Sequence, residues 1–329
     1  MKRYAVLVAV WLLLSTVVLF AWQPQQSAPA ESRNYVVIGM SQVGAESDWR
    51  VANSESMKSV FTEENGYQLL FDDARQKQEN QIAAVRKFIQ QRVDYIVIMP
   101  IGENGWDSVM REARDAGIPV ILVDRMVDIR DPSLITAHVG ADFYAEGQRA
   151  VGWLEDRFAQ AEQVNIVHIQ GTEGSSAQLG RTRALMEAME ENENWNLLAQ
   201  LNGDFTQAKT YEVILEYLNT EGCPPIDVVY CENDNEAFGA IEALESMGYT
   251  CGEEGVTVVS FDATRHALEL CLEGKIAMDA ECNPLLGPLV EQVVQTLESG
   301  DTPEKNHYIE ERYFVKEDLS EEFIAGRMY

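Results

Sequence analysis

From residue 35 onward, short apolar runs rich in β-branched residues alternate with amphipathic stretches of helical length. The apolar runs are Val36–Gly39, Gln68–Phe71, Tyr95–Met99, Val120–Val123, Val164–Ile169, Leu197–Leu201, Asp227–Cys231, Val256–Phe261 and Ile276–Ala280. The helical stretches between them include Gln78–Gln91, Gly105–Ala116, Tyr144–Phe158, Arg181–Glu191, Thr206–Leu218 and Asn235–Ser246. This alternation predicts βαβ units and parallel sheets that are buried on both faces.

The same pattern repeats coarsely in two halves of the chain. The segment up to about Val123 gives four β-α units, and the segment from Val164 to Phe261 gives four more. Each half has the usual size of a domain. Between the halves, the residues Val139-Gly140-Ala141-Asp142 predict an extended crossing followed by a capped helix. We therefore expect an α/β protein of two doubly wound parallel-sheet lobes.

Composition and the N-terminus narrow the class of protein. Hydrophobic residues make up 46% of the 329 residues, which is enough for a substantial core. The net charge of −29 disfavours nucleic acid or an anionic membrane surface as a partner. Lys2 and Arg3 precede an apolar stretch from Tyr4 to Trp22, and Ala28-Pro29-Ala30 follows. Residues 1–30 thus predict an export signal or an uncleaved membrane anchor, and in both cases an exported protein, periplasmic or on the outer face of the cytoplasmic membrane.

The cysteines do not indicate a metal site. All five lie in the second half, at positions 223, 231, 251, 271 and 282, without a C-x-x-C pair, and no nearby histidine completes a metal site. Buried free thiols that behave as small hydrophobes are one interpretation, and a single disulfide is another. We expect no metal and no cofactor.

Polar and aromatic residues follow the predicted strands at successive carboxyl ends, where open parallel sheets bind their ligands. The candidate binding residues are Ser41, Glu46, Trp49, Arg50, Asp124, Arg125, Arg181, Phe205, Asn233, Asp262 and Glu281. Carboxylates accept hydrogen bonds from neighbouring sugar hydroxyls, arginine donates in a planar fork, and asparagine does both. Aromatic rings cover the apolar C–H face of a sugar ring. The set predicts a monosaccharide site.

Each of these residues also has a structural interpretation of its own. Asp124 and Asp262 could each cap a helix, and Trp49 could belong to the core. Arg181 could be a solvated helix residue, and Glu46 could favour the positive end of the helix that follows it. Their concerted placement at successive strand ends favours the binding interpretation.

At this point the chain resembles a known family. The strand ends Val123-Asp124-Arg125, Gln170-Gly171-Thr172, Gly203-Asp204-Phe205, Asn233-Asp234, Phe261-Asp262 and Ala280-Glu281 are similar to those of type I periplasmic sugar-binding proteins of ABC importers, the ribose- and galactose-binding family. The segments 39–50 (GMSQVGAESDWR) and 76–82 (QKQENQI) resemble its galactofuranose-binding members in particular.

The resemblance implies two lobes around one sugar, joined by three crossings near Gly140, Glu281 and Arg312. The N-terminal lobe would comprise residues 34–140 and 282–311, and the C-terminal lobe residues 141–281 and 312–329. Glu46, Trp49, Arg50, Asp124 and Arg125 would come from the first lobe, and Arg181, Phe205, Asn233, Asp262 and Glu281 from the second lobe or the hinge. The chain departs from the family pattern at Asn235 and at Cys282-Asn283-Pro284-Leu285.

The resemblance predicts a monomeric, non-enzymatic solute-binding protein. Its closed form would deliver a monosaccharide, galactofuranose or a related hexose or pentose, to the membrane permease of an ABC importer. A membrane-anchored sensor that presents the closed form to a receptor kinase is an alternative. A glycoside hydrolase could use Asp124 and Asp262, yet no G-x-S-x-G, H-E-x-x-H or P-loop motif occurs. A DNA-binding repressor would need a helix-turn-helix where the export-like segment stands.

Overall fold

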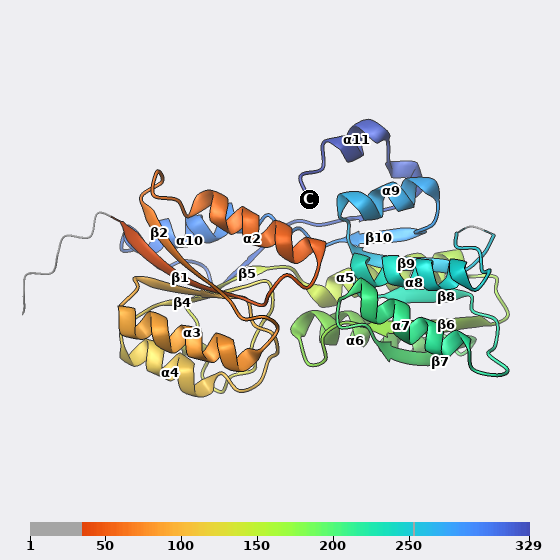
Figure 1. The fold of residues 1–329 in the computed structure, drawn as a ribbon, viewed down its shortest axis with the longest axis horizontal. Helices are drawn as coiled ribbons and strands as arrows, with labels where there is room; N and C mark the ends of the chain where they lie inside the picture. Colours follow the sequence, from red (N-terminus) through yellow and green to blue (C-terminus); the bar gives the residue numbers. More distant parts are fainter. Residues whose placement is uncertain (1–34, 253) are drawn as a thin grey trace, which may run out of the picture. The chain divides into compact units, whose positions relative to one another are not determined.

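Two six-stranded sheets organise the protein in the computed structural model, which describes residues 35–252 and 254–329 (Figure 1). The first sheet has the order β11-β5-β4-β3-β1-β2, and all its neighbouring strands are parallel. Its strands are β1 (Val36–Gln42), β2 (Tyr67–Asp73), β3 (Tyr95–Ile98), β4 (Val120–Val123), β5 (Ala137–Gly140) and β11 (Asn306–Tyr308).

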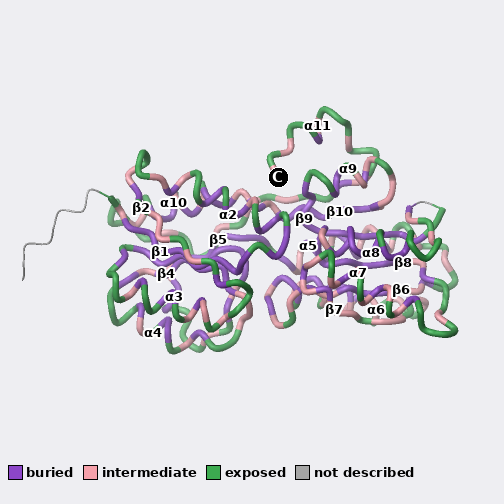
Figure 2. Tube along the Cα trace, viewed as in Figure 1, coloured by how far each residue is buried: buried purple, intermediate pink, exposed green. Residues whose placement is uncertain are grey.

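The second sheet has the order β12-β10-β9-β8-β6-β7 and is parallel except for the pair of β12 with β10. Its strands are β6 (Val164–Gln170), β7 (Trp195–Asn202), β8 (Val228–Cys231), β9 (Thr257–Asp262), β10 (Met278–Glu281) and β12 (Tyr313–Phe314). In both sheets the central strands are buried along their whole length, as strands covered on both faces must be. Figure 2 shows this as buried residues along the strands and exposed residues on the outer sides of the helices.

Helices cover both faces of each sheet. In the first lobe, α2 (Asp48–Val60) and α10 (Gly287–Glu298) pack on one face, and α3 (Gln78–Gln91) and α4 (Asp107–Asp115) pack on the other. In the second lobe, one face carries α5 (Phe143–Arg157) and α6 (Ser176–Glu191). The opposite face carries α7 (Gln207–Leu218), α8 (Asp234–Ser246) and α9 (Arg265–Glu273). The helix α11 (Glu321–Ala325) packs beside α9.

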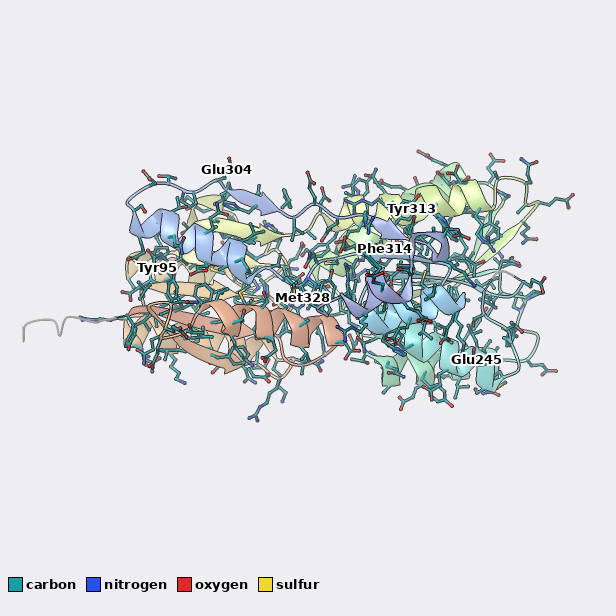
Figure 3. The ribbon with its side chains drawn as sticks, turned by 90° about the horizontal axis from the view of Figure 1, so that it is seen from above. Tyr95, Glu245, Glu304, Tyr313, Phe314 and Met328 are labelled. Carbon is teal, nitrogen blue, oxygen red and sulfur yellow. The ribbon has the colours of Figure 1, made fainter. Side chains whose placement is uncertain are left out.

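The chain passes between the two sheets three times. It leaves the first sheet after β5, returns after β10, and leaves again between β11 and β12. Figure 3 shows the last passage: Glu304 lies with the first lobe, whereas Tyr313 and Phe314 of β12 lie with the second. Three passages leave the lobes joined only by short segments at one side, the arrangement that permits hinge motion.

The predicted fold class is confirmed: the protein is α/β, with two doubly wound parallel-sheet lobes and three connections. The helix capped by Asp142 is present as predicted, and the extended residues before it belong to a sheet strand, 137–140, between β4 and β11. The limits of each lobe, 34–140 plus 282–311 and 141–281 plus 312–329, stay a prediction. The apolar stretch within residues 1–30 lies outside the described residues. Among the residues that are described, no helix is both long and apolar enough to cross a membrane.

Candidate functional site

A small cavity lies where the carboxyl ends of the two sheets face each other. All the candidate binding residues except Ser41 and Glu281 line it. The complete lining is Glu46, Ser47, Trp49, Arg50, Asp124, Arg125, Phe143, Ala177, Arg181, Phe205, Asn233, Asp262 and Cys282. The free space within it is about 20 Å³, close to the room that one water molecule needs, so the lining side chains nearly fill the cavity in this structure.

The first-lobe wall of the cavity, formed by Glu46, Trp49, Arg50, Asp124 and Arg125, is a network of buried ion pairs. Arg125 Nη2 donates to Glu46 Oε1 at 2.6 Å, and Arg50 Nε and Nη2 donate to the same oxygen at 3.3 Å. Arg50 Nη2 also donates to Asp124 Oδ2 at 2.7 Å. Arg50 Nη1 and Arg125 Nε are buried and have no hydrogen-bond partner among the described residues. They are donors that a bound polar group can satisfy.

Burial and ion pairing shift the pKa of these two guanidinium groups in opposite directions. Burial acts to lower the pKa of Arg50, but Asp124 and Glu46 together outweigh it and leave this pKa above its ordinary value. For Arg125 the burial effect, with the nearby positive charge of Arg50, outweighs the attraction of Glu46, so its pKa is lowered.

The second-lobe wall, formed by Phe143, Arg181, Phe205, Asn233 and Asp262, has one arginine. Arg181 Nη2 lies 2.7 Å from Glu146 Oε2 and 3.5 Å from Asp262 Oδ1. Glu146 and Asp262 raise the pKa of Arg181 well above its ordinary value, against the opposing effect of burial. Burial and the neighbouring carboxylates raise the pKa of Asp262, an effect that Arg181 only partly offsets. Asn233 caps α8 by accepting from the Glu236 backbone N–H at 2.8 Å.

Three cavity residues at strand ends have left-handed backbone conformations. Their φ angles are 64° for Asp124, 60° for Phe205 and 111° for Asp262. Such conformations cost roughly 1–3 kcal/mol each in residues other than glycine, and they cluster at functional sites. Two hydrogen bonds hold Phe205 in this conformation: its N–H donates to Glu236 Oε1 at 2.9 Å, and its carbonyl accepts from Asn233 Nδ2 at 3.2 Å.

Apolar groups from both walls meet in the same cavity. The rings of Trp49, Phe143 and Phe205 pack in one buried cluster with Ala141, Ala177 and Cys282. Trp49 Nε1 donates to the Cys282 carbonyl at 2.7 Å, which fixes the plane of the indole ring. A Cβ on residue 171 would lie 2.0 Å from the Phe205 ring, so glycine there is what lets this ring enter the cavity.

The rims of the two lobes touch, and the structure is therefore the closed form. Asp48 N–H donates to Asn235 Oδ1 at 3.0 Å, and Met126 N–H donates to Ser176 Oγ at 2.8 Å. Glu103 N–H donates to the Gly174 carbonyl at 3.0 Å. These bonds join loops and the first turn of α2 in the first lobe to the starts of α6 and α8 and the loop before α6 in the second. Behind them the charged residues of the cavity are almost completely buried.

The comparisons with known proteins agree with this geometry. Residues 38–284 match the family model described as a periplasmic binding protein domain. The chain belongs to the periplasmic binding protein family.

Similar members of this family bind sugars. The chain is 35% identical to the galactofuranose-binding protein YtfQ of Escherichia coli, over 87% of this chain and 90% of that protein. It is 39% identical to a Mycobacterium smegmatis protein solved in complex with β-D-fucofuranose, with 86% and 92% of the two chains covered and a TM-score of 0.82. A Shewanella arabinose-transporter component bound to L-arabinofuranose is 34% identical, with coverage of 85% and 92% and a TM-score of 0.81. The resemblance seen at the strand ends is thus confirmed.

Two candidate residues of this periplasmic binding protein lie outside the cavity. Ser41 is fully buried within β1, where it pairs with Ile98 of β3. It lies inside the strand rather than after it because β1 continues to Gln42. Glu281 holds the last residues of the chain: its Oε1 forms an ion pair with Arg327 Nη2 at 2.8 Å and accepts from Tyr329 Oη at 3.1 Å. The structure therefore does not bring either side chain together with the others.

Four lining residues were not among the candidates: Ser47, Phe143, Ala177 and Cys282. Cys282 directly follows β10, so the strand-end rule could have found it. Phe143 begins α5 right after its cap Asp142, and Ser47 caps α2. In the sequence, the two capping residues indicate the start of a helix but do not indicate a cavity. All five cysteines are among the described residues and are free thiols, so the interpretation with one disulfide does not apply to this structure.

Proposed function

We propose that this periplasmic binding protein captures one monosaccharide between its lobes and delivers it to the membrane permease of an ABC importer. The sugar that the relatives favour is galactofuranose or a related hexose or pentose in its furanose form. The observation that carries the proposal is the lining of the closed cavity, in which paired charges and aromatic rings from both lobes face one another.

The charges of the cavity favour a neutral ligand with many hydroxyl groups. The three arginines are each paired with carboxylates, so neither an anion nor a cation would meet a large uncompensated charge. Arg50, Arg125 and Arg181 would donate to hydroxyl oxygens, and Glu46, Asp124, Asp262 and Asn233 would accept from hydroxyl groups. Charge-assisted hydrogen bonds of this kind are shorter and stronger than neutral ones.

The rings of Trp49, Phe143 and Phe205 would cover the apolar C–H surface of the sugar. Stacked aromatic contacts of this kind add to the area that each ring buries. The set of Glu46, Trp49, Arg50, Asp124, Arg125, Arg181, Phe205, Asn233 and Asp262 is therefore our proposal for the sugar-binding residues. Ser47, Phe143, Ala177 and Cys282 complete the lining.

The protein is a binding protein rather than an enzyme. Its relative in Escherichia coli is a binding protein, and the Shewanella relative is the binding component of a transporter. Such a protein functions by closing around its ligand. A ligand that contacts both walls stabilises the closed form because it binds that form more tightly. The closed form then presents one continuous surface to the membrane partner.

Isothermal titration calorimetry with D-galactose, D-fucose, L-arabinose and D-ribose tests the proposal. We expect saturable heat with at least one sugar and a matching rise in melting temperature, since ligands that bind only the folded state stabilise it. No heat and no thermal shift with any pentose or hexose would overturn the proposed function.

The role of residues 1–30 belongs to the same proposal. We place the protein outside the cytoplasmic membrane as a monomer, with residues 1–30 acting as an export signal or as an anchor. An anchored protein that signals to a receptor kinase is the alternative, because the apolar N-terminal stretch is long and has no cysteine near its end for a lipid. Fractionation of cells and mass spectrometry of the exported form distinguish a cleaved N-terminus from a retained one.

A further inference from the structure

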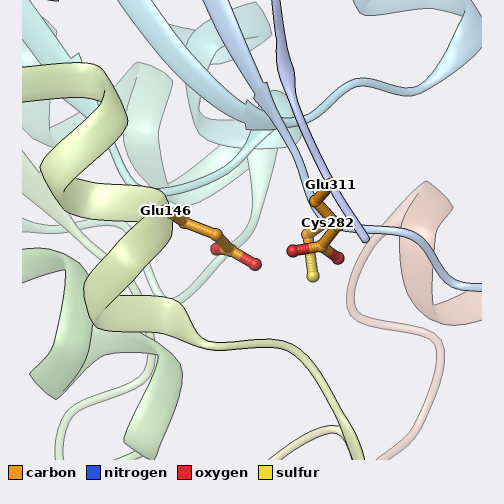
Figure 4. Close-up of side chains that lie close together, drawn as sticks. All are labelled: Glu146, Cys282 and Glu311. Atoms are coloured by element: carbon orange, nitrogen blue, oxygen red, sulfur yellow. The ribbon is translucent and has the colours of Figure 1, made fainter. Parts of the chain in front are cut away.

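The three connections between the lobes bring three titratable side chains together. Glu146 lies in the first turn of α5, just beyond the first connection. Cys282 follows β10 in the second connection, and Glu311 lies between β11 and β12 in the third. One ligand atom of each residue lies within 4.8 Å of the others. Figure 4 shows the Glu146 side chain extending from its helix toward Cys282 and Glu311, which come from neighbouring chain segments.

The two oxygens of Glu146 have different surroundings. Oε2 accepts from Arg181 Nε at 2.8 Å and lies 2.7 Å from Arg181 Nη2. Oε1 is fully buried and has no hydrogen-bond partner among the described residues. A buried carboxylate oxygen without a donor is costly, and within the cluster the carboxyl of Glu311 and the thiol of Cys282 are the groups that can supply a proton.

Glu311 is well placed to carry that proton. Its Oε1 accepts from the Asn283 backbone N–H at 2.9 Å. Burial and the neighbouring charge of Glu146 raise the pKa of Glu311 to about 9, although Asn283 and Arg149 act in the opposite direction. Two carboxyl groups this close cannot both ionise without a large repulsion, so they titrate as a pair with one proton between them.

A metal ion is a poorer occupant of the same cluster. Cysteine and carboxylate ligands must lose their protons to bind a metal. Burial and the two glutamates raise the pKa of the Cys282 thiol well above its ordinary value, which keeps it protonated. In addition, Arg181 and Arg149 already place positive charge beside Glu146. A proton neutralises the cluster without adding a second positive centre.

We propose that Glu146 and Glu311 share one proton in the closed form, and that closure over a sugar takes this proton up from solvent. The inference rests on the proposed function, because it concerns the closure that the sugar drives. Opening moves the second lobe, and Glu146 with it, relative to the connection that carries Glu311. Glu311, which is only half-buried in the closed form, then loses the neighbouring charge of Glu146 and ionises as an ordinary carboxylate.

The shared proton matters for binding because Glu146 positions Arg181. An ionised Glu311 would repel Glu146 and compete with it for the nearby guanidinium groups, and Arg181 would lose its fixed place in the cavity. Glu311 is thus a positioning residue that acts through Glu146. The other titratable or charged groups that face this pair are Arg149, Arg181, Tyr230, Asp262 and Cys282.

The sign of the pH dependence follows from the raised pKa. Between the ordinary pKa of a glutamate, about 4.3, and the value of about 9 in the closed form, closure requires a proton that the open form lacks. The contribution of Glu311 to sugar affinity therefore falls as the pH rises through this window. Uptake of one proton corresponds to about a tenfold loss of affinity per pH unit.

Calorimetry of the full exported chain at neutral pH tests this inference. The sugar that gives the most heat among D-galactose, D-fucose and L-arabinose is titrated in phosphate and in Tris, whose ionisation enthalpies differ. The number of protons taken up follows from the difference in heat. The test variant is Glu311→Gln, which keeps the shape of the neutral carboxyl group, and the matched control is Glu310→Gln at the exposed neighbouring position.

We expect the wild-type protein and Glu310→Gln to take up close to one proton more per sugar than Glu311→Gln. We also expect Glu311→Gln to flatten the fall of affinity between pH 6 and 8. Equal proton uptake in all three proteins would overturn the inference, and so would tight zinc binding that Cys282→Ser abolishes. Heat without buffer dependence rejects the shared proton but leaves the sugar function intact, whereas no heat with any sugar rejects the function itself.

Discussion

In the first wall of the cavity, two arginines share one carboxylate. The second wall has a single arginine, and its main carboxylate partner lies outside the lining of the cavity. Arg50 and Arg125 both donate to Glu46, and all three side chains line the cavity. Arg181 is held by Glu146, which does not line the cavity and lies beside the connections between the lobes. The charges of the first wall are thus paired within the cavity, while the arginine of the second wall is held by a residue beside the connections between the lobes.

This difference predicts that the first wall is the more sensitive to loss of one charge. Glu46→Ala leaves two buried guanidinium groups with a single remaining carboxylate, Asp124. Breaking a buried ion pair from one side costs roughly 3–5 kcal/mol. We expect the free energy of unfolding, measured by urea denaturation, to fall by an amount in this range and sugar binding to be lost.

The matched control for this variant is Glu55→Ala on α2. Glu55 forms an exposed pair with Lys58, and exposed pairs contribute about 0–1 kcal/mol. If Glu46→Ala and Glu55→Ala lowered the free energy of unfolding equally, the network on the first wall would not be the stabilising unit described above.

The second prediction concerns the aromatic part of the first wall. Trp49→Ala removes both the ring and the bond from its Nε1 to the Cys282 carbonyl. Buried tryptophans at binding surfaces often cost about 2 kcal/mol or more on truncation, which is roughly a 30-fold loss of affinity. Calorimetry should show this loss, and Trp49→Phe should recover part of it because a ring remains. A folded Trp49→Ala protein with full sugar affinity would remove Trp49 from the proposed site.

The third prediction addresses the second wall. Arg181→Lys keeps the positive charge but loses the planar fork that engages Glu146 and faces Asp262. We expect affinity to fall about tenfold, equivalent to about 1.4 kcal/mol, with little change in melting temperature. Arg183→Lys, on the exposed side of the same helix, is the control and should bind as the wild type does. Equal affinities for the two variants would contradict a role for Arg181 in binding.

The sequence predicted most of this architecture because burial on both faces leaves an unmistakable pattern. Val120–Val123 and Gln78–Gln91 have in the structure the bounds that the pattern predicts, since an apolar strand and an amphipathic helix each carry their own period. Strand ends such as Asp124 and Phe205 were found by the rule that parallel sheets gather ligand groups at one edge.

What the sequence could not reveal depends on contacts between distant segments. Glu281 stands at a strand end as the rule demands, but its partners Arg327 and Tyr329 come from the other end of the lobe's sequence. In the sequence, Glu146 is an ordinary helix residue, and only the fold shows that Glu311 lies beside it. Local sequence patterns predict which residues reach the edge of the cavity. The partner of each charged side chain depends instead on which distant segments the topology brings together.

The smallest effect is expected at the rim, where the two walls meet. The chain departs from the family pattern at Asn235, and this residue forms two bonds with Asp48 of the opposite lobe, at 3.0 and 3.3 Å. An aspartate here would face the carboxylate of Asp48, so Asn235→Asp should weaken closure by repulsion. Because the pair is solvent-exposed, the loss should stay below about 1 kcal/mol, and it should shrink as salt is added. Asn235→Ala removes the same bonds without the repulsion, and its affinity should not respond to salt. If both variants lost affinity equally at every ionic strength, only the hydrogen bonds would matter at the rim, and charge would act on this protein solely inside the cavity.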